Sequence, residues 1–174
     1  MKLKIDKKQL KTVAWFLIKF NLLAIPMYLI LYFNVSMQPL QLFFAQALAN
    51  GLNSLGYKTY FIESPISTIP LISISGTNAQ PIYVSTDSTG WKSLYALTAL
   101  VLATPNKKTK KRVKFLAIAL PSIFIINYLR MLTTILICLR FGFKYFDFVH
   151  GFLWSWGLIS AILVLWFMWL KDKL

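Results

Sequence analysis

Three polar residues with chemically useful side chains lie at or within apolar stretches of the chain. Ser88 follows Asp87 at the start of one stretch, Arg130 lies inside another, and His150 directly precedes a third. Polar groups in such positions are costly in a membrane and usually face protein or water. A hydroxyl, a guanidinium and an imidazole are also groups that serve nucleophilic and acid–base catalysis. These residues are therefore the candidates for a reactive site.

Helix geometry predicts that the three groups lie at a similar depth. Arg130 stands 15 residues after Phe115, where its apolar stretch begins, and a helix rises roughly 22 Å over that length. It therefore reaches the side of the bilayer on which the other two stretches begin. Asn127 precedes Arg130 by three positions, so the two side chains share a helix face. We expect the three groups to gather around one pocket near the outer boundary of the membrane.

Each residue also has a plainer interpretation. The polar run around Ser88 could simply cap a helix. Arg130 could extend toward lipid headgroups, and a single histidine such as His150 at a helix start is more often a surface or capping residue. The common depth of the three groups, with Asn127 beside the arginine, favours a shared site. Cys138 has only apolar neighbours and is expected to be a packing residue.

The composition indicates one membrane domain over residues 1–174. Of all residues, 57% are hydrophobic and only 14% are charged, which is far from a usual soluble domain. The net charge of +14 is concentrated in short runs between apolar stretches, so a nucleic-acid-binding surface is not expected. A single cysteine allows no internal disulfide and no multi-cysteine metal site, and neither a metal nor another cofactor is expected. Four apolar stretches approach the length of a membrane span, over about residues 12–33, 88–104, 115–139 and 151–170, and the second is short.

Clusters of lysine and arginine predict the orientation of these spans. Basic residues in short loops mark the cytoplasmic side of a membrane protein. One cluster lies in the loop 105–114, a second precedes the first span, and Lys171 and Lys173 follow the last. With four spans, all three clusters fall on one side. Both termini are therefore predicted to be cytoplasmic, and residues 34–87 to form an outer loop.

The predicted outer loop shows two further patterns. Apolar residues recur at helical spacing over residues 40–55, with Gln41 and other amides between them, which predicts an interfacial helix. Short alternating runs at 71–75 and 81–85, separated by the turn-forming Gly-Thr-Asn at 76–78, predict a small β-hairpin. The expected fold is thus an all-α integral membrane protein with four transmembrane helices, an outer interfacial helix and a small hairpin.

The candidate residues also resemble the exosortase and archaeosortase family of membrane transpeptidases. That family shows a Cys-(Ser/Thr)-Gly element opening one span, an Asn-x-x-Arg element in the next, and a downstream histidine. The corresponding segments here are Asp87-Ser88-Thr89-Gly90-Trp91-Lys92-Ser93-Leu94, Asn127-Tyr128-Leu129-Arg130 and His150. The resemblance covers about residues 80–170, and the order of the three elements is more specific than any one of them.

The resemblance implies a role for each residue. Position 88 would hold the nucleophile, Arg130 would stabilise the oxyanion, and His150 would act as general acid and base. The residues beside them are expected to bind substrate: Asp87, Thr89, Gly90, Lys92 and Asn127. The implied mechanism needs no cofactor.

Ser88 departs from the family pattern, which has cysteine at this position. The chain is therefore either a natural serine variant or carries a Cys-to-Ser substitution, and the intact pattern around it favours the second. A cysteine in the first turn of a helix would be favoured as thiolate by the helix dipole. A serine hydroxyl lacks this advantage and would depend on His150 as its base, so little residual activity is expected.

The implied function is cleavage of C-terminal sorting signals and transfer of the new carboxyl end to an acceptor, for which a lipid is one candidate. The partners would be membrane-anchored substrate proteins and the bilayer, with the active site on the extracytoplasmic side of a multi-pass cell-membrane protein. Two other classes stay open. A small transporter or channel could use buried charges such as Lys19, Lys92 and Arg130, and a non-catalytic assembly protein would fit a native serine. The transporter is disfavoured because the spans show no acidic partner and no repeated half.

Overall fold

The computed structural model describes residues 6–62, 69–75 and 81–171, and these are mostly helical. Within them, three helical segments are long and apolar enough to cross a membrane: α1 (Lys7–Tyr32), α4 (Thr109–Phe141) and the run Phe143–Leu170. This run consists of η2 (Phe143–Tyr145), α5 (Phe146–Phe152), the π-helical η3 (Leu153–Leu158) and α6 (Ile159–Leu170). Three of the four predicted spans are therefore present as helices of spanning length.

The helix α3 (Trp91–Ala103), expected to be the second span, is shorter than the others. Its 13 residues rise about 20 Å, against a hydrocarbon thickness of about 30 Å. The predicted helix start at Ser88 is wrong by three residues. Residues Thr86–Thr89 form a separate 3₁₀ turn, η1, and Gly90 then takes a left-handed conformation with φ of 73° before α3 begins. Four spans remain a prediction.

Other helix ends also differ from the predicted spans. The helix α4 begins at Thr109, inside the segment 105–114 that was expected to be a loop. Lysine and arginine are good helix formers, so a basic run extends a helix beyond its apolar part. The last helical run also begins before the predicted Gly151, because hydropathy locates the apolar part of a helix and not its ends.

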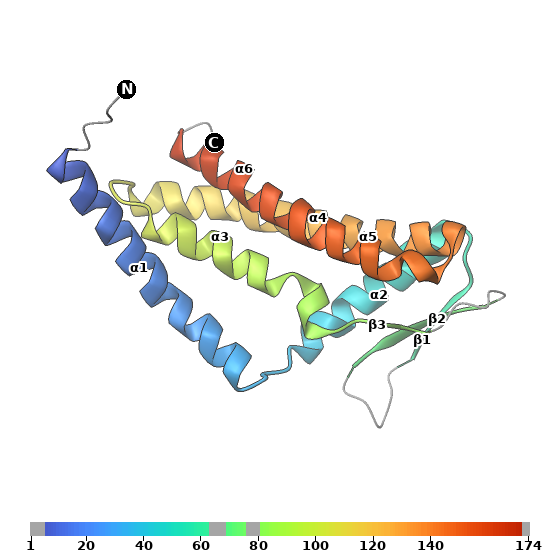
Figure 1. The fold of residues 1–174 in the computed structure, drawn as a ribbon. Coiled ribbons are helices and arrows are strands. Elements are labelled where there is room, and N and C mark those ends of the chain that lie inside the picture. The colour runs from blue at the N-terminus through green and yellow to red at the C-terminus, as the bar shows by residue number, and fades with distance from the viewer. Residues whose placement is uncertain (1–5, 63–68, 76–80, 172–174) are drawn as a thin grey trace.

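The helices form a bundle with the two ends of the described chain at the same end of the molecule (Figure 1). The helix α3 packs against α1, α4 and α6. The connection between α3 and α4 also lies at the end that holds the termini, whereas α2 and the small sheet lie at the other end (Figure 1). We call these the basic end and the site end of the molecule.

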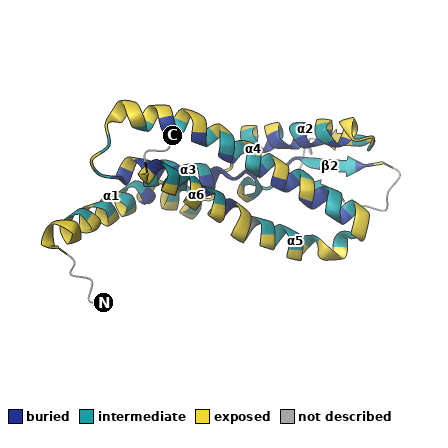
Figure 2. Ribbon diagram, turned by 90° about the horizontal axis from the view of Figure 1, so that it is seen from above, coloured by how far each residue is buried: buried dark blue, intermediate teal, exposed yellow. Residues whose placement is uncertain are grey.

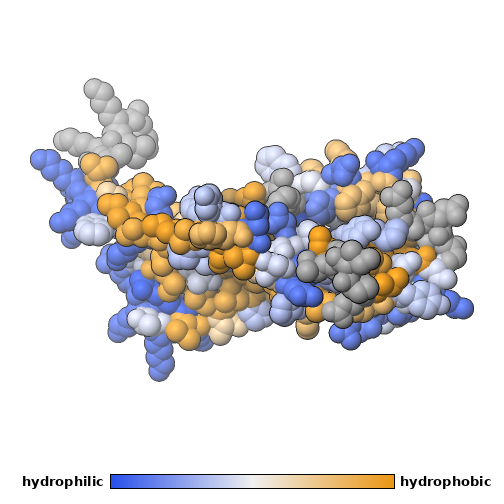
Figure 3. Space-filling model, turned by 90° about the horizontal axis from the view of Figure 1, so that it is seen from below, coloured by the Kyte–Doolittle hydropathy of each residue, from blue (hydrophilic) through white to orange (hydrophobic). Residues whose placement is uncertain are grey.

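Exposed residues follow the outer sides of the helices, and buried residues lie where helices face one another (Figure 2). Many of the exposed side chains are large and apolar, among them Leu17, Leu22 and Phe167. Apolar surface covers much of the helical region, with hydrophilic groups toward the two ends (Figure 3). Exposed apolar side chains on helices of this length are typical of contact with lipid.

At the site end, the helix α2 (Gln38–Ser54) packs on α4 and on a three-stranded sheet. The strands β1 (Thr59–Ile62), β2 (Leu71–Ile74) and β3 (Ile82–Tyr83) are antiparallel in the order β1-β2-β3, with Leu71 opposite Tyr83. The two strands of the predicted hairpin are confirmed, and the turn predicted at 76–78 lies outside the described residues. The first strand was missed, although Thr-Tyr-Phe-Ile is a run of residues that favour strands.

Two apolar clusters hold the molecule together. In the first, Phe44 and Leu48 of α2 meet Ile72 of β2 and Ile135 of α4, so the outer elements are fixed to one long helix. In the second, residues of α3, α4 and α6 meet: Leu97, Val101, Phe115, Ala119, Ile123, Ile162 and Trp169. The helix α4 contributes to both clusters and therefore connects the site end to the basic end.

A helix, α2, is present where the interfacial helix was predicted, but its buried face differs from the expected one. Gln41 was expected on a polar face, yet only 1% of it is exposed, whereas Phe43 is mostly exposed. Hydrogen bonds explain the burial of this amide. Its Nε2 donates to the Val84 carbonyl at 2.9 Å, and its Oε1 accepts from the Thr86 hydroxyl at 3.2 Å. Gln41 therefore attaches α2 to the segment that leads into η1.

Candidate active site

Ser88 lies in η1, and its neighbours in that turn hold it in place. Its hydroxyl is 3.0 Å from the Ser85 hydroxyl, and its backbone N–H donates to the same Ser85 oxygen at 3.3 Å. Thr89 is buried and donates its hydroxyl to the Thr86 carbonyl at 2.7 Å. Thr89 thus stabilises the turn. Ser88 thus lies just before the N-terminus of α3 and not in its first turn, as was expected.

Two residues of α4 converge on the backbone of Ser88. The Asn127 Nδ2 donates to the Ser88 carbonyl at 3.0 Å, and the Arg130 Nη2 donates to the same oxygen at 3.1 Å. Both side chains are buried, with 1% and 7% of their surface exposed. The spacing of three residues places them on one face of α4, as predicted. Asn127 and Arg130 act together on Ser88, and their shared partner is a backbone carbonyl that no motif in the sequence indicates.

Gly90 has two independent reasons to be glycine. Its φ of 73° lies in the left-handed region that other residues occupy at a cost. A Cβ added there would also lie only 2.8 Å from the Asn127 Cγ. Its close approach to Asn127 gives Gly90 a packing role, and the expected contact with substrate stays a prediction. The absence of a side chain lets the start of α3 approach Asn127 closely.

Arg130 keeps two donors unused within the described part of the chain. Its Nε and Nη1 are buried and have no hydrogen-bond partner there, and the same holds for the Asn127 Oδ1. Buried donors without a partner are rare and costly, particularly on a charged group. An oxygen atom of a bound molecule, especially one that carries negative charge, would satisfy them. The structure therefore leaves two donors of a buried cation unsatisfied beside Ser88.

His150 belongs to α5, which packs on α4. Its half-buried imidazole interacts electrostatically with Arg130 and Asp147 and stacks on Phe146, with ring centroids 5.3 Å apart. His150 was expected at a helix start, but α5 begins four residues earlier, at Phe146. The π-helical η3 begins three residues after it, and such segments recur at functional sites. The fold therefore brings His150 into the electrostatic range of Arg130.

Asp87 and Lys92 form an ion pair at the rim of this site. The Lys92 Nζ lies 2.8 Å from an oxygen of Asp87, and both side chains remain partly exposed. Their exposed sides are open to a substrate, while the pair connects η1 to the first turn of α3. Cys138, by contrast, is buried in α4, as expected of a packing residue.

The structure adds two residues that the sequence patterns did not single out. Ser85 holds the hydroxyl and the N–H of Ser88, and Gln41 holds the segment before it. Ser85 carries a recognisable signal, because a serine three residues before Ser88 is suited to cap a short turn. Gln41 carries only a weak one, an amide among apolar residues of a helix.

Comparison with known proteins identifies the family of the chain. No curated protein and no solved structure matches the chain. The family model described as transmembrane exosortase matches residues 7–171, nearly the whole chain, and includes every residue of the site. The chain therefore belongs to the transmembrane exosortase family.

Proposed function

We propose that the chain is a membrane transpeptidase of the cysteine type, with Ser88 at the position of the nucleophile. It would cleave C-terminal sorting signals of membrane-anchored proteins and transfer the new carboxyl end to an acceptor. The observation that carries the proposal is the environment of the Ser88 carbonyl, which Asn127 and Arg130 hold from α4 while two donors of Arg130 stay unused among the described residues. Membership of the transmembrane exosortase family supports it.

The proposed reaction has two steps. The nucleophile at position 88 gives its proton to His150 and attacks the carbonyl carbon of the scissile peptide bond, and the resulting oxyanion accepts hydrogen bonds from Arg130. His150 protonates the amine that leaves, so the bond between carbonyl carbon and nitrogen breaks and an acyl-enzyme remains. An acceptor amine or hydroxyl, deprotonated by His150, then attacks the acyl carbon. The nucleophile is released and the substrate carboxyl end is bound to the acceptor.

We further propose four spans with both termini in the cytoplasm and the site near the outer face of the membrane. The arrangement of the bundle supports this topology, because the basic loop between α3 and α4 lies at the same end as both termini (Figure 1). The positive-inside rule then assigns that end to the cytoplasm. In this topology α3 would be the short second span, and α2 and the sheet would frame the site outside the membrane.

The chain with Ser88 should turn over substrate slowly. A serine hydroxyl is far less acidic than a thiol, so a base must remove its proton during the attack on the peptide carbonyl. A thiolate makes the same attack without a base. Ser88→Cys should therefore raise activity strongly. The short turn around Ser88 accepts this change, because sulfur replaces oxygen with no change in backbone.

The test compares the Ser88 chain with Ser88→Cys in cells that co-express a membrane protein with a candidate C-terminal signal. The second protein is then analysed by mass spectrometry for loss of its tail. We expect tail loss with Ser88→Cys, little with Ser88, and none with Ser88→Cys that also carries Arg130→Gln. An intact tail in the Ser88→Cys cells, beside removal of the same tail by an active exosortase, would contradict the proposal for that substrate.

A second readout does not depend on the substrate. In a Cys138→Ser background, Ser88→Cys provides the only thiol of the chain. This thiol should react with an iodoacetamide probe faster than an ordinary cysteine. A rate no higher than that of free cysteine would argue for a non-catalytic assembly protein instead.

A further inference from the structure

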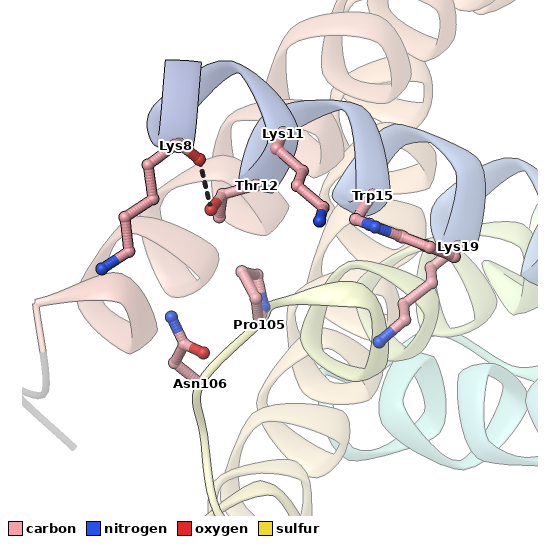
Figure 4. Close-up of a pocket in the computed structure, with 7 residues that line it drawn as sticks. All are labelled: Lys8, Lys11, Thr12, Trp15, Lys19, Pro105 and Asn106. Carbon is pink, nitrogen blue, oxygen red and sulfur yellow. Dashed lines mark hydrogen bonds between the residues drawn. The ribbon is translucent and has the colours of Figure 1, made fainter. Parts of the chain in front are cut away.

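We propose that a pocket at the basic end of the molecule binds the headgroup of an anionic phospholipid. The pocket has a volume of about 460 Å³ and lies between the first half of α1 and the connection from α3 to α4. Lys8, Lys11, Trp15 and Lys19 line it from α1, and Pro105 and Asn106 line it from the connection. It lies beyond the C-terminal end of α3 (Figure 4), whereas Ser88 of the candidate active site lies before the N-terminal end of that helix.

The spacing of the α1 residues explains why their side chains meet. Lys8, Lys11, Trp15 and Lys19 are three or four positions apart, so they follow one face of the helix. The amines of the three lysines and the amide of Asn106 surround the space over Pro105 (Figure 4). From Lys8 to Lys19 the helix rises roughly 16 Å. The positive face therefore runs from the end of α1 into its apolar middle.

The charge of this pocket is not neutralised within the described residues. Among the described residues, the ion pair joins Lys92 to Asp87 at the candidate active site. Lys8, Lys11 and Lys19 of the pocket take part in no ion pair with these residues. Asp6 is the nearest carboxylate in sequence, and it caps α1 by accepting from the Lys8 backbone N–H. Three neighbouring cations without a counter-charge repel one another, so an anion between them would be stabilised.

The surroundings favour a lipid over a soluble anion. The helix α1 is a candidate membrane span, and its apolar residues Leu10 and Val13 are exposed next to the pocket. Trp15 is half exposed, and tryptophan is enriched at the level of lipid headgroups. A phosphate could lie among the lysine amines while its acyl chains follow the apolar side of α1. Basic pockets between membrane helices bind anionic headgroups in this way.

Lys19 adds a third amine to this pocket. A lysine in the apolar part of a helix usually extends its amine toward the nearer membrane surface. Here the Lys19 side chain extends toward Pro105, into the same space as the Lys11 amine (Figure 4). Snorkelling toward the basic end therefore brings the Lys19 amine into the pocket, where an anion would be stabilised.

The test measures lipid binding to the purified full chain by native mass spectrometry, with phosphatidylglycerol and phosphatidylcholine as probes. We expect the wild type to prefer phosphatidylglycerol, and Lys11→Gln with Lys19→Gln to weaken that binding about ten-fold, since each lysine contributes on the order of a few-fold. The matched control is Lys110→Gln with Lys114→Gln, which removes the same charge from exposed positions of α4 at the same end. This control should change the affinity less than two-fold.

Three results would overturn the proposal: equal losses in the two double variants, no preference of the wild type for phosphatidylglycerol, or full displacement of the lipid by millimolar inorganic phosphate. The last would identify a site for a free anion. A second measurement covers a failure of the lysine variant to fold. Phosphatidylglycerol with brominated chains should quench the fluorescence of the wild type more than that of Trp15→Phe, and equal quenching would count against the site.

Discussion

Replacing Gly90 with alanine tests the contact on which the geometry of the site depends. Gly90 combines a left-handed backbone with a close approach to Asn127, and Asn127 in turn holds the Ser88 carbonyl. Gly90→Ala should therefore destabilise the protein through the backbone and through a steric clash. It should also displace the nucleophile position.

The magnitude follows from these two effects. A left-handed conformation costs a residue with a Cβ about 1–2 kcal/mol. The new Cβ would lie 2.8 Å from the Asn127 Cγ, so the buried Asn127 must move, and overpacking of this kind costs about 1–3 kcal/mol. We expect a loss of about 3 kcal/mol in the free energy of unfolding. Gly56→Ala is the matched control. Gly56 has a φ of 91°, but a Cβ added there would meet no atom within 4 Å. This change should therefore cost only about 1 kcal/mol in the free energy of unfolding.

The assay is unfolding of the purified chain by titration with a denaturing detergent, followed by circular dichroism. A double-mutant cycle isolates the clash, because Asn127→Ala removes the group that the new Cβ meets. In that background Gly90→Ala should cost no more than Gly56→Ala. If Gly90→Ala is as mild as the control in the wild type, or costs the same with and without Asn127, the argument for a tight contact between α3 and α4 is refuted.

Three further predictions concern activity and stability. In the Ser88→Cys background, Arg130→Lys should keep the positive charge but lose the forked pair of hydrogen-bond donors. The rate of tail cleavage should then fall roughly 10²–10³-fold while the circular dichroism spectrum stays unchanged. A loss of rate below about three-fold would contradict the oxyanion role of Arg130. In the same background, His150→Gln should abolish transfer to the acceptor, measured by mass spectrometry of the product, and normal transfer would exclude His150 as the acid and base. Gln41→Leu should reduce the free energy of unfolding by about 1–3 kcal/mol, because the Val84 carbonyl and the Thr86 hydroxyl lose their buried partner. The control, Gln46→Leu at an exposed position, should change the free energy of unfolding by less than about 0.5 kcal/mol. Equal effects of the two variants would contradict this reasoning.

Much of the fold could be predicted because lipid imposes a simple rule on sequence. Apolar stretches near span length located α1, α4 and the last helical run, and an alternating pattern located β2 and β3. The ends of the helices could not be predicted from hydropathy, since a basic run extends the N-terminus of α4 to Thr109. The start of α3 was missed because the polar run Asp87-Ser88-Thr89 also fits the cap of a helix that begins at Ser88, and the left-handed conformation of Gly90 cannot be inferred from this pattern.

The shared helix face of Asn127 and Arg130 could be predicted from the sequence, but the hydrogen bonds of the candidate site could not. The spacing of Asn127 and Arg130 correctly placed them on one face of α4. Their common partner, the Ser88 carbonyl, is a backbone atom 39 residues from Asn127, and no local pattern reports such a bond. The burial of Gln41 depends in the same way on a partner 43 residues distant. Tertiary hydrogen bonds of buried polar groups were therefore the part of the site that could not be predicted from the sequence.

The shortness of α3 has a consequence for the bilayer around the protein. In the proposed topology this helix is about 10 Å shorter than the hydrocarbon it would cross, so hydrophobic mismatch must be relieved by local thinning of the membrane. Thinning would bring water down to Ser88 and would let a scissile bond react without leaving the membrane entirely. Turnover should then depend on acyl-chain length, with faster cleavage in vesicles of short-chain lipids than in those of long-chain lipids.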